Sequence, residues 1–194
     1  MSWSLSRFAP RHPELLDALF LAAGRALHLA SAYENKCQYV LRMGHLATAI
    51  QTEPVLTLDE LIAATPADKM LGGTLHCLAS HPMGVTMDMD ILHKAREARN
   101  FIAHEGASIG YSWSARRESI LEHAVKLRAA VADLAAGDNL ISQWCYGLEE
   151  PDASQPTDWI AAYPDLVDRW VFAGVFALLP ESVQAQPGSP DASP

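Results

Sequence analysis

The sequence has few cysteines and no CxxC pair. Its 194 residues include only Cys37, Cys77 and Cys145. Three scattered cysteines do not make a disulfide framework, so we expect reduced thiols in a cytoplasmic protein. Cys77 and His81 are four residues apart, a spacing that can share a metal ion on one helix, but no second ligand cluster follows them. We therefore expect no metal and no other cofactor.

The sequence also lacks a long hydrophobic run. The longest, WVFAGVFALL (Trp170–Leu179), is about half of what a helix needs to cross a bilayer. The N-terminal residues show no basic stretch followed by an apolar one, so we expect no signal peptide. These absences predict a soluble protein with no membrane partner.

Basic residues are scarce. Lysine and arginine number 14 against 23 acidic residues, which gives a net charge of −9 and argues against a broad, non-specific nucleic-acid binder. Residues 91–128 differ, because they hold seven basic and four acidic residues and so carry +3. This zone is either a local site for a phosphate group or only uneven surface charge.

Strand patterns are scarce too. Only residues 54–58 (PVLTL) have the character of a strand, while apolar residues elsewhere recur at helical spacing. We predict an all-α bundle of four to five main helices. The expected organisation is a flexible arm at 1–12, the bundle at 13–146, a loop at 147–158, a C-terminal helical region packing on the bundle at 159–180, and a disordered tail at 181–194.

The first helix is expected from Pro13 to near Met43, since proline suits a first helical turn. Its apolar residues recur on one side: Leu16, Phe20, Ala23, Leu27, Ala30, Cys37 and Leu41. Thr57 resembles the N-cap of a short helix. The next helical segment starts weakly or breaks at Gly72-Gly73, and His81-Pro82 ends it.

Two longer helices and a C-terminal one complete the expected bundle. One runs from about Met87 to Glu105 and is stopped by Gly106. Another runs from a cap at Ser114 to about Ala136. Its apolar face consists of Ile120, Ala124, Leu127, Val131 and Leu134. The last helical region is expected to be interrupted at Pro164.

The segment KAREARNFIAHEGA (residues 94–107) places polar residues on a helix that already has an apolar face. At about 100° per residue, one stripe is formed by Ile91, Ala95, Ala98 and Ile102. Away from it lie His93, Arg96, Asn100 and His104. Arg99 is at the border of the stripe, about 140° from His104. The two would meet only if the helix loosens before Gly106 or if a second copy of the chain completes the site.

Glu34 is a second polar residue at an apolar position. It follows Leu16 by 18 residues, which is five helical turns, so it falls within the apolar stripe of the first helix. A buried carboxylate needs a partner. Arg99, at the edge of the facing stripe, is the expected partner, and the alternative is that the helix bends before Glu34 and leaves the acid in water.

An arginine and a histidine are enough to cleave RNA without a metal. Histidine takes or gives a proton near neutral pH, so His104 would activate the ribose 2′-OH or protonate the leaving 5′-oxygen. Arg99 would grip phosphate oxygens and stabilise the charge of the transition state. Asn100 would orient the histidine or hold a phosphate. The product would carry a 2′,3′-cyclic phosphate.

Arg99, Asn100 and His104, near the end of a helix in an all-α chain, resemble the motif of the HEPN superfamily. The motif covers six residues, and the helical pattern extends the resemblance over about residues 13–140. It implies a homodimer and a metal-independent endoribonuclease with Arg99 and His104 catalytic and Asn100 supporting. We expect Glu34, Arg96 and His93 to support this site.

The resemblance also implies a biological setting, since many HEPN proteins are toxins or antiviral effectors, so an antitoxin protein is a possible partner. One branch carries a tyrosine two residues after the histidine, where this chain has Gly106. Two alternatives stay open: a non-catalytic HEPN-like module that binds RNA, a nucleotide or a protein partner, and a helical scaffold whose polar face is only solvated.

Overall fold

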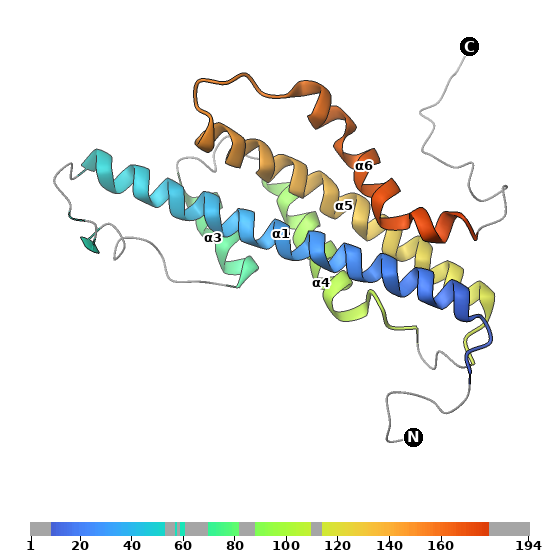
Figure 1. Cartoon of the computed structure of the whole chain (residues 1–194). Coiled ribbons are helices and arrows are strands. Elements are labelled where there is room, and N and C mark those ends of the chain that lie inside the picture. Colours follow the sequence, from blue (N-terminus) through green and yellow to red (C-terminus); the bar gives the residue numbers. More distant parts are fainter. Residues whose placement is uncertain are drawn as a thin grey trace, which may run out of the picture.

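The protein is an all-α bundle, as its sequence predicts (Figure 1). The computed structural model describes residues 9–52, 57, 59–60, 70–81, 88–109 and 114–178. Over these residues it contains no strand and five helices: α1 (Pro13–Thr52), α3 (Leu71–Ser80), α4 (Met89–Glu105), α5 (Arg117–Glu149) and α6 (Thr157–Phe176).

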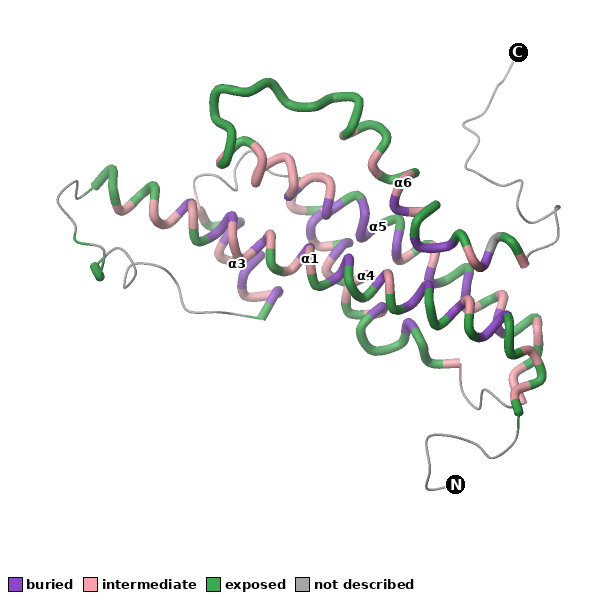
Figure 2. The backbone as a smooth tube through the Cα atoms, in the orientation of Figure 1, coloured by how far each residue is buried: buried purple, intermediate pink, exposed green. Residues whose placement is uncertain are grey.

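The two longest helices, α1 and α5, pack against each other along the middle of the bundle. Helix α6 lies along both of them, while α4 packs mainly on α5 and also contacts α1 and α3 (Figure 1). Buried residues follow the lines where these helices meet (Figure 2). The core is mainly leucine, alanine and valine, so burial of aliphatic side chains holds the bundle together.

Helix α1 is long and apolar enough to cross a membrane by length and composition alone. Of its most apolar 18-residue window, 44% is buried inside the bundle. A core helix of a water-soluble protein has the same character, so this feature is weak evidence for a membrane span.

Several helix ends differ from the sequence prediction. Helix α1 continues to Thr52 rather than ending near Met43. Helix α5 starts at Arg117 rather than after Ser114, and it continues through Gly137 to Glu149, so the predicted loop at 147–158 is shorter. Gly137 lies within the helix, where its lack of a side chain allows close packing: a Cβ there would lie 2.3 Å from the Ala95 Cβ of α4.

Helix α6 runs without a break through Pro164, where an interruption was expected. Proline has no N–H, so the carbonyl of Ile160, four residues earlier, loses its helical donor. The side-chain amide of Asn139 on α5 replaces that donor, with Nδ2 2.9 Å from the Ile160 oxygen. A tertiary hydrogen bond thus compensates for the proline.

Some expectations were made for residues that the structure describes only in part. The Thr57 cap is present: its hydroxyl oxygen accepts from the Glu60 N–H at 3.4 Å, and its own backbone N–H donates to the Glu60 carboxylate at 2.8 Å. The helix expected after it, the strand at 54–58, most of the N-terminal arm and the tail at 181–194 lie largely or wholly outside the described residues.

Candidate functional site

Helix α4 carries the Arg99–His104 motif and is fixed by the side chains on its apolar face. Asp88 caps its start by accepting a hydrogen bond from the Ile91 N–H. The buried residues of this helix are Leu92, Ala95, Ala98 and Ile102. Leu92 therefore replaces Ile91 in the predicted stripe, and Ile91 is only half-buried. The helix ends at Glu105 and Gly106 follows, as expected.

Arg99 is held by Glu34 across the α1–α4 contact. Its Nη2 and Nε atoms donate to the same Glu34 oxygen, Oε2, at 2.6 and 3.1 Å. The two side chains are partly buried, with exposed fractions of 28% for Arg99 and 20% for Glu34. The ion pair inferred from the position of Glu34 is therefore present, and it fixes the direction of the guanidinium group.

The third nitrogen of this guanidinium group faces Asn100. Nη1 of Arg99 donates to the Asn100 Oδ1 at 3.2 Å. Asn100 itself is exposed. Arg99 thus links a partly buried carboxylate to an exposed amide on the polar face of α4.

The pattern of α4 alone predicted that Arg96 points away from the core. In the structure, however, it does not point freely into solvent. It is half-buried, and a Cβ added to Gly72 of α3 would lie 3.2 Å from its Nη1 atom. The contact arises because α3 covers this side of α4. The Nε atom of Arg96 is buried and has no hydrogen-bond partner within the described part of the chain. His93, one turn earlier, is half-buried too.

His104 is exposed at the last turn of α4 and has no hydrogen-bond partner among the described residues. It lines a surface hollow of about 400 Å³ between the end of α4 and helix α1. The wall from α1 includes Phe20 and Leu27, which were expected in the core but are 41% and 47% exposed. The histidine therefore stands beside an apolar surface.

One protomer does not bring Arg99 and His104 to a single point. Helix α4 keeps its form to Glu105, so five helical positions separate the two residues by about 7.5 Å along the axis and about 140° around it. Arg99 faces Glu34, whereas His104 faces the stretch of α1 around Gly24. The predicted loosening of the helix before Gly106 is absent, which leaves completion by another molecule as the remaining route.

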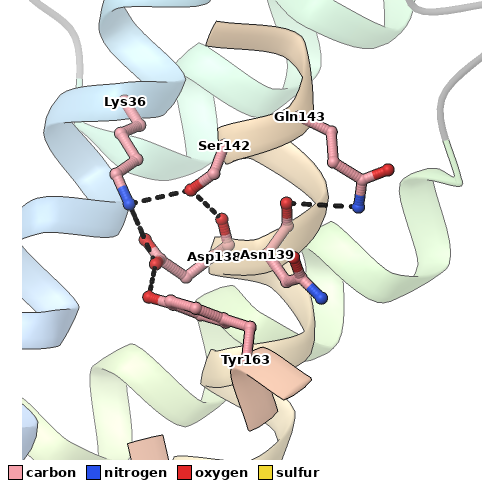
Figure 3. Close-up of polar contacts among 6 residues, drawn as sticks. All are labelled: Lys36, Asp138, Asn139, Ser142, Gln143 and Tyr163. Carbon is pink, nitrogen blue, oxygen red and sulfur yellow. Dashed lines mark hydrogen bonds and ion pairs between the residues drawn. The ribbon is translucent and has the colours of Figure 1, made fainter. Parts of the chain in front are cut away.

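A second polar cluster joins α1, α5 and α6, and the sequence analysis did not identify it (Figure 3). Lys36 donates to both carboxylate oxygens of Asp138 and to the Ser142 hydroxyl, each at 2.9 Å. The hydroxyl of Tyr163 donates to the same carboxylate. Asp138 is fully buried. Burial raises the pKa of Tyr163, and its hydrogen bond to Asp138 raises it further.

The signal for this cluster was available. Asp138 follows Ile120 by 18 residues, so it lies five turns along the apolar stripe of α5, as Glu34 does on α1. Its partners come from α1 and α6, which are remote in sequence. A buried carboxylate paired with lysine and tyrosine fits a role in holding the three helices in place.

Comparison of the chain with protein-family models, with curated proteins and with solved structures found no match. Among the described residues, no group of three or more histidine, cysteine and acidic side chains is placed to hold a metal ion. The HEPN resemblance and the roles of Arg99, Asn100 and His104 stay predictions that rest on the motif and on the geometry above.

Proposed function

We propose that this protein is a metal-independent endoribonuclease of HEPN type that acts as a homodimer, with the role of a toxin or antiviral-defence effector. One observation carries the proposal. Glu34 fixes Arg99 at the border of a helix face on which Asn100 and His104 are exposed, next to an apolar hollow. Neither exposed residue has a role in the core, so a substrate or a facing subunit accounts for them best.

The chemistry follows from the side chains. His104 exchanges a proton with the ribose 2′-OH or with the leaving oxygen. Arg99 keeps its Nη1 side toward the exposed face, where a guanidinium group stabilises the charge of a phosphorane-like transition state. Arg96 adds a second, half-buried cation on the same helix.

A second copy of the chain would complete the site. Within one protomer Arg99 and His104 lie on different sides of α4, so the arginine of one subunit would act with the histidine of the other. The exposed Phe20 and Leu27 beside His104 provide an apolar surface for such a contact. The two motifs would then face each other across a cleft.

The test uses RNA, EDTA and mixed subunits. We expect wild-type protein to cleave single-stranded RNA to 2′,3′-cyclic phosphate products, and Arg99→Ala and His104→Ala each to lose at least about 100-fold in rate. His76→Ala, which removes an exposed histidine on α3, is the matched control. Arg99→Ala and His104→Ala subunits, mixed after mild unfolding, should recover part of the activity. A folded dimer that leaves every tested RNA intact contradicts the proposal.

The alternative is a non-catalytic module that binds RNA, a nucleotide or a protein partner such as an antitoxin. The pairing of two of the three guanidinium nitrogens of Arg99 with Glu34 favours it, because those donors are occupied. This alternative predicts binding with intact RNA, and affinity that does not change in His104→Ala.

A further inference from the structure

A second hollow lies at the end of the bundle where α1 and α5 both begin. Its volume is about 250 Å³, and it is lined by Arg11, His12, Glu14, Arg117 and Leu178, among others. Two arginines, a histidine and one carboxylate therefore line the same hollow. On a chain with a net charge of −9, a hollow with two arginines against one glutamate is a place where an anion is favoured.

The two arginines and the histidine of this hollow are held in different ways. Arg117 is fixed, because its Nη2 atom donates to the Leu178 carbonyl at 3.1 Å. Its other nitrogens have no partner among the residues that the structure describes. Arg11 is exposed, and it has no partner among the described residues. His12 is anchored by its backbone, since its carbonyl accepts the Leu16 N–H at 3.1 Å. A fixed guanidinium group and an exposed one can contact an anion from two sides.

The backbone adds to the same charge. The first-turn N–H groups of a helix have no partner within the helix and carry partial positive charge. Glu14 and Leu15 belong to the first turn of α1 and line the hollow, while Arg117 is the first residue of α5. The backbone thus favours the same ligand as the arginine side chains do.

We propose that this hollow binds a phosphoryl group. The volume is below the roughly 300 to 1,000 Å³ of pockets that enclose a whole drug-sized ligand, so it suits one phosphate rather than a complete nucleotide. If the proposed ribonuclease function holds, on which this part rests, the group is a phosphate of the RNA substrate. Phe20 lines the hollow of His104, and Pro13 lines the hollow described here. The two residues are about 10 Å apart along α1, so one short RNA strand reaches both hollows.

The first experiment uses inorganic phosphate as the probe. Phosphate is titrated into ¹⁵N-labelled protein at low ionic strength, and the amide signals of Glu14 and Leu15 are followed. We expect Arg11→Ala and Arg117→Ala each to weaken binding about tenfold, the loss of one charge-assisted hydrogen bond. Glu14→Gln should tighten it, because the opposing carboxylate is removed. Arg169→Ala, at an exposed arginine on α6, should bind as wild type does.

Arg11→Ala removes a side chain that has no partner in the described part of the chain. Its effect therefore does not depend on whether Arg117→Ala keeps the end of α6 in place. Unchanged binding in both Arg11→Ala and Glu14→Gln overturns the proposal, as does equal weakening in Arg169→Ala.

The second experiment identifies the source of the phosphate. Binding of a single-stranded RNA oligonucleotide is measured in a His104→Ala background, where the RNA stays intact. Weaker RNA binding on adding Arg11→Ala assigns the hollow to the substrate; unchanged RNA binding overturns that assignment and leaves a site for free phosphate. Because phosphate titration needs no cleavage, failure of the ribonuclease proposal and failure of this one are distinguishable.

Discussion

At Arg99, a carboxylate on another helix decides where the guanidinium group points. Two hydrogen bonds to one Glu34 oxygen hold it at the edge of α4, and the third nitrogen is left facing Asn100. A guanidinium group fixed before the substrate arrives loses less entropy on binding a phosphate than a free one does.

We expect Glu34→Gln to separate positioning from folding. The amide keeps the size and one acceptor but loses the charge, so the unfolding free energy should fall by about 1 to 2 kcal/mol. RNA cleavage should fall more than RNA affinity, because Arg99 would lose its direction. Urea unfolding and single-turnover cleavage measure the two effects. Glu97→Gln, at an exposed acid of α4, is the control. If Glu34→Gln and Glu97→Gln behave identically, Glu34 does not position Arg99.

How far the site can be read from the sequence differs from residue to residue. Glu34 was found because a carboxylate at an apolar position needs a partner, and the nearest facing cation was Arg99. The position of the Arg96 side chain could not be predicted, because it depends on where α3 lies. No pattern within α4 contains that information. Phe20 and Leu27 were misplaced for the same reason: helical spacing shows which residues share a face, but not which part of that face is covered.

At the scale of helices, glycines within a helix have opposite roles that the sequence does not distinguish. A Cβ at Gly137 would lie 2.3 Å from Ala95, while one at Gly24 would have no neighbour within 4 Å. Gly137 therefore allows α4 and α5 to approach closely, and Gly24 is a plain interruption of the surface of α1.

We expect the matched variants Gly137→Ala and Gly24→Ala to shift stability in opposite directions. Gly137→Ala should lower the unfolding free energy by about 1 to 3 kcal/mol through overpacking. Gly24→Ala should raise it by about 0.5 to 1 kcal/mol, since alanine favours the helix. Chemical denaturation measures both values. A Gly137→Ala variant at least as stable as the wild type would show that the helix separation at Gly137 is not fixed.

Asn139 and Pro164 form a second pair whose coupling can be measured. We expect Asn139→Ala to cost about 1 to 2 kcal/mol, because the Ile160 carbonyl loses its donor. In a Pro164→Ala background that carbonyl regains a helical donor, so the same substitution should cost clearly less. A double-mutant cycle by urea unfolding gives the coupling energy. Equal costs in the two backgrounds would mean that the amide does not compensate for the proline.

For the whole molecule, the buried thiol of Cys37 and the half-buried thiol of Cys145 set an upper pH limit on stability. Burial raises the pKa of Cys37 from 9.0 to about 12 and that of Cys145 from 9.0 to about 11. The folded state therefore keeps these protons at a pH where the unfolded chain has released them. The stabilisation is complete below the unfolded pKa near 9 and is lost as pH rises toward 11 and 12.

We expect the melting temperature to be level from pH 7 to about 8.5 and to fall steadily above pH 9. Cys37→Ala and Cys145→Ala, which remove one titrating group each, should have a shallower decline even where their stability at neutral pH is lower. Calorimetry across this pH range gives the slopes. A decline as steep as that of the wild type in both variants would assign the alkaline loss to other groups.

The bundle itself was predictable because its apolar residues follow one period along nearly the whole chain. What was not predictable is the set of contacts between distant segments: α6 crossing its proline, Asp138 meeting Lys36, and α3 covering Arg96. Each depends on pairing elements that are remote in sequence. The contacts of the proposed dimer are unpredictable from the sequence for the same reason, because the facing surface belongs to another molecule.

The hydrogen bond from Asn139 to Ile160 also has a consequence for alignment. Pro164 leaves one carbonyl of α6 without its helical donor, and a single amide on α5 meets it. If α6 moved by one turn along α5, the Asn139 amide would no longer reach the Ile160 carbonyl, and that carbonyl would have no donor. Pro164 interrupts the hydrogen bonding of its own helix, and for that reason it favours a single register of α6 on α5.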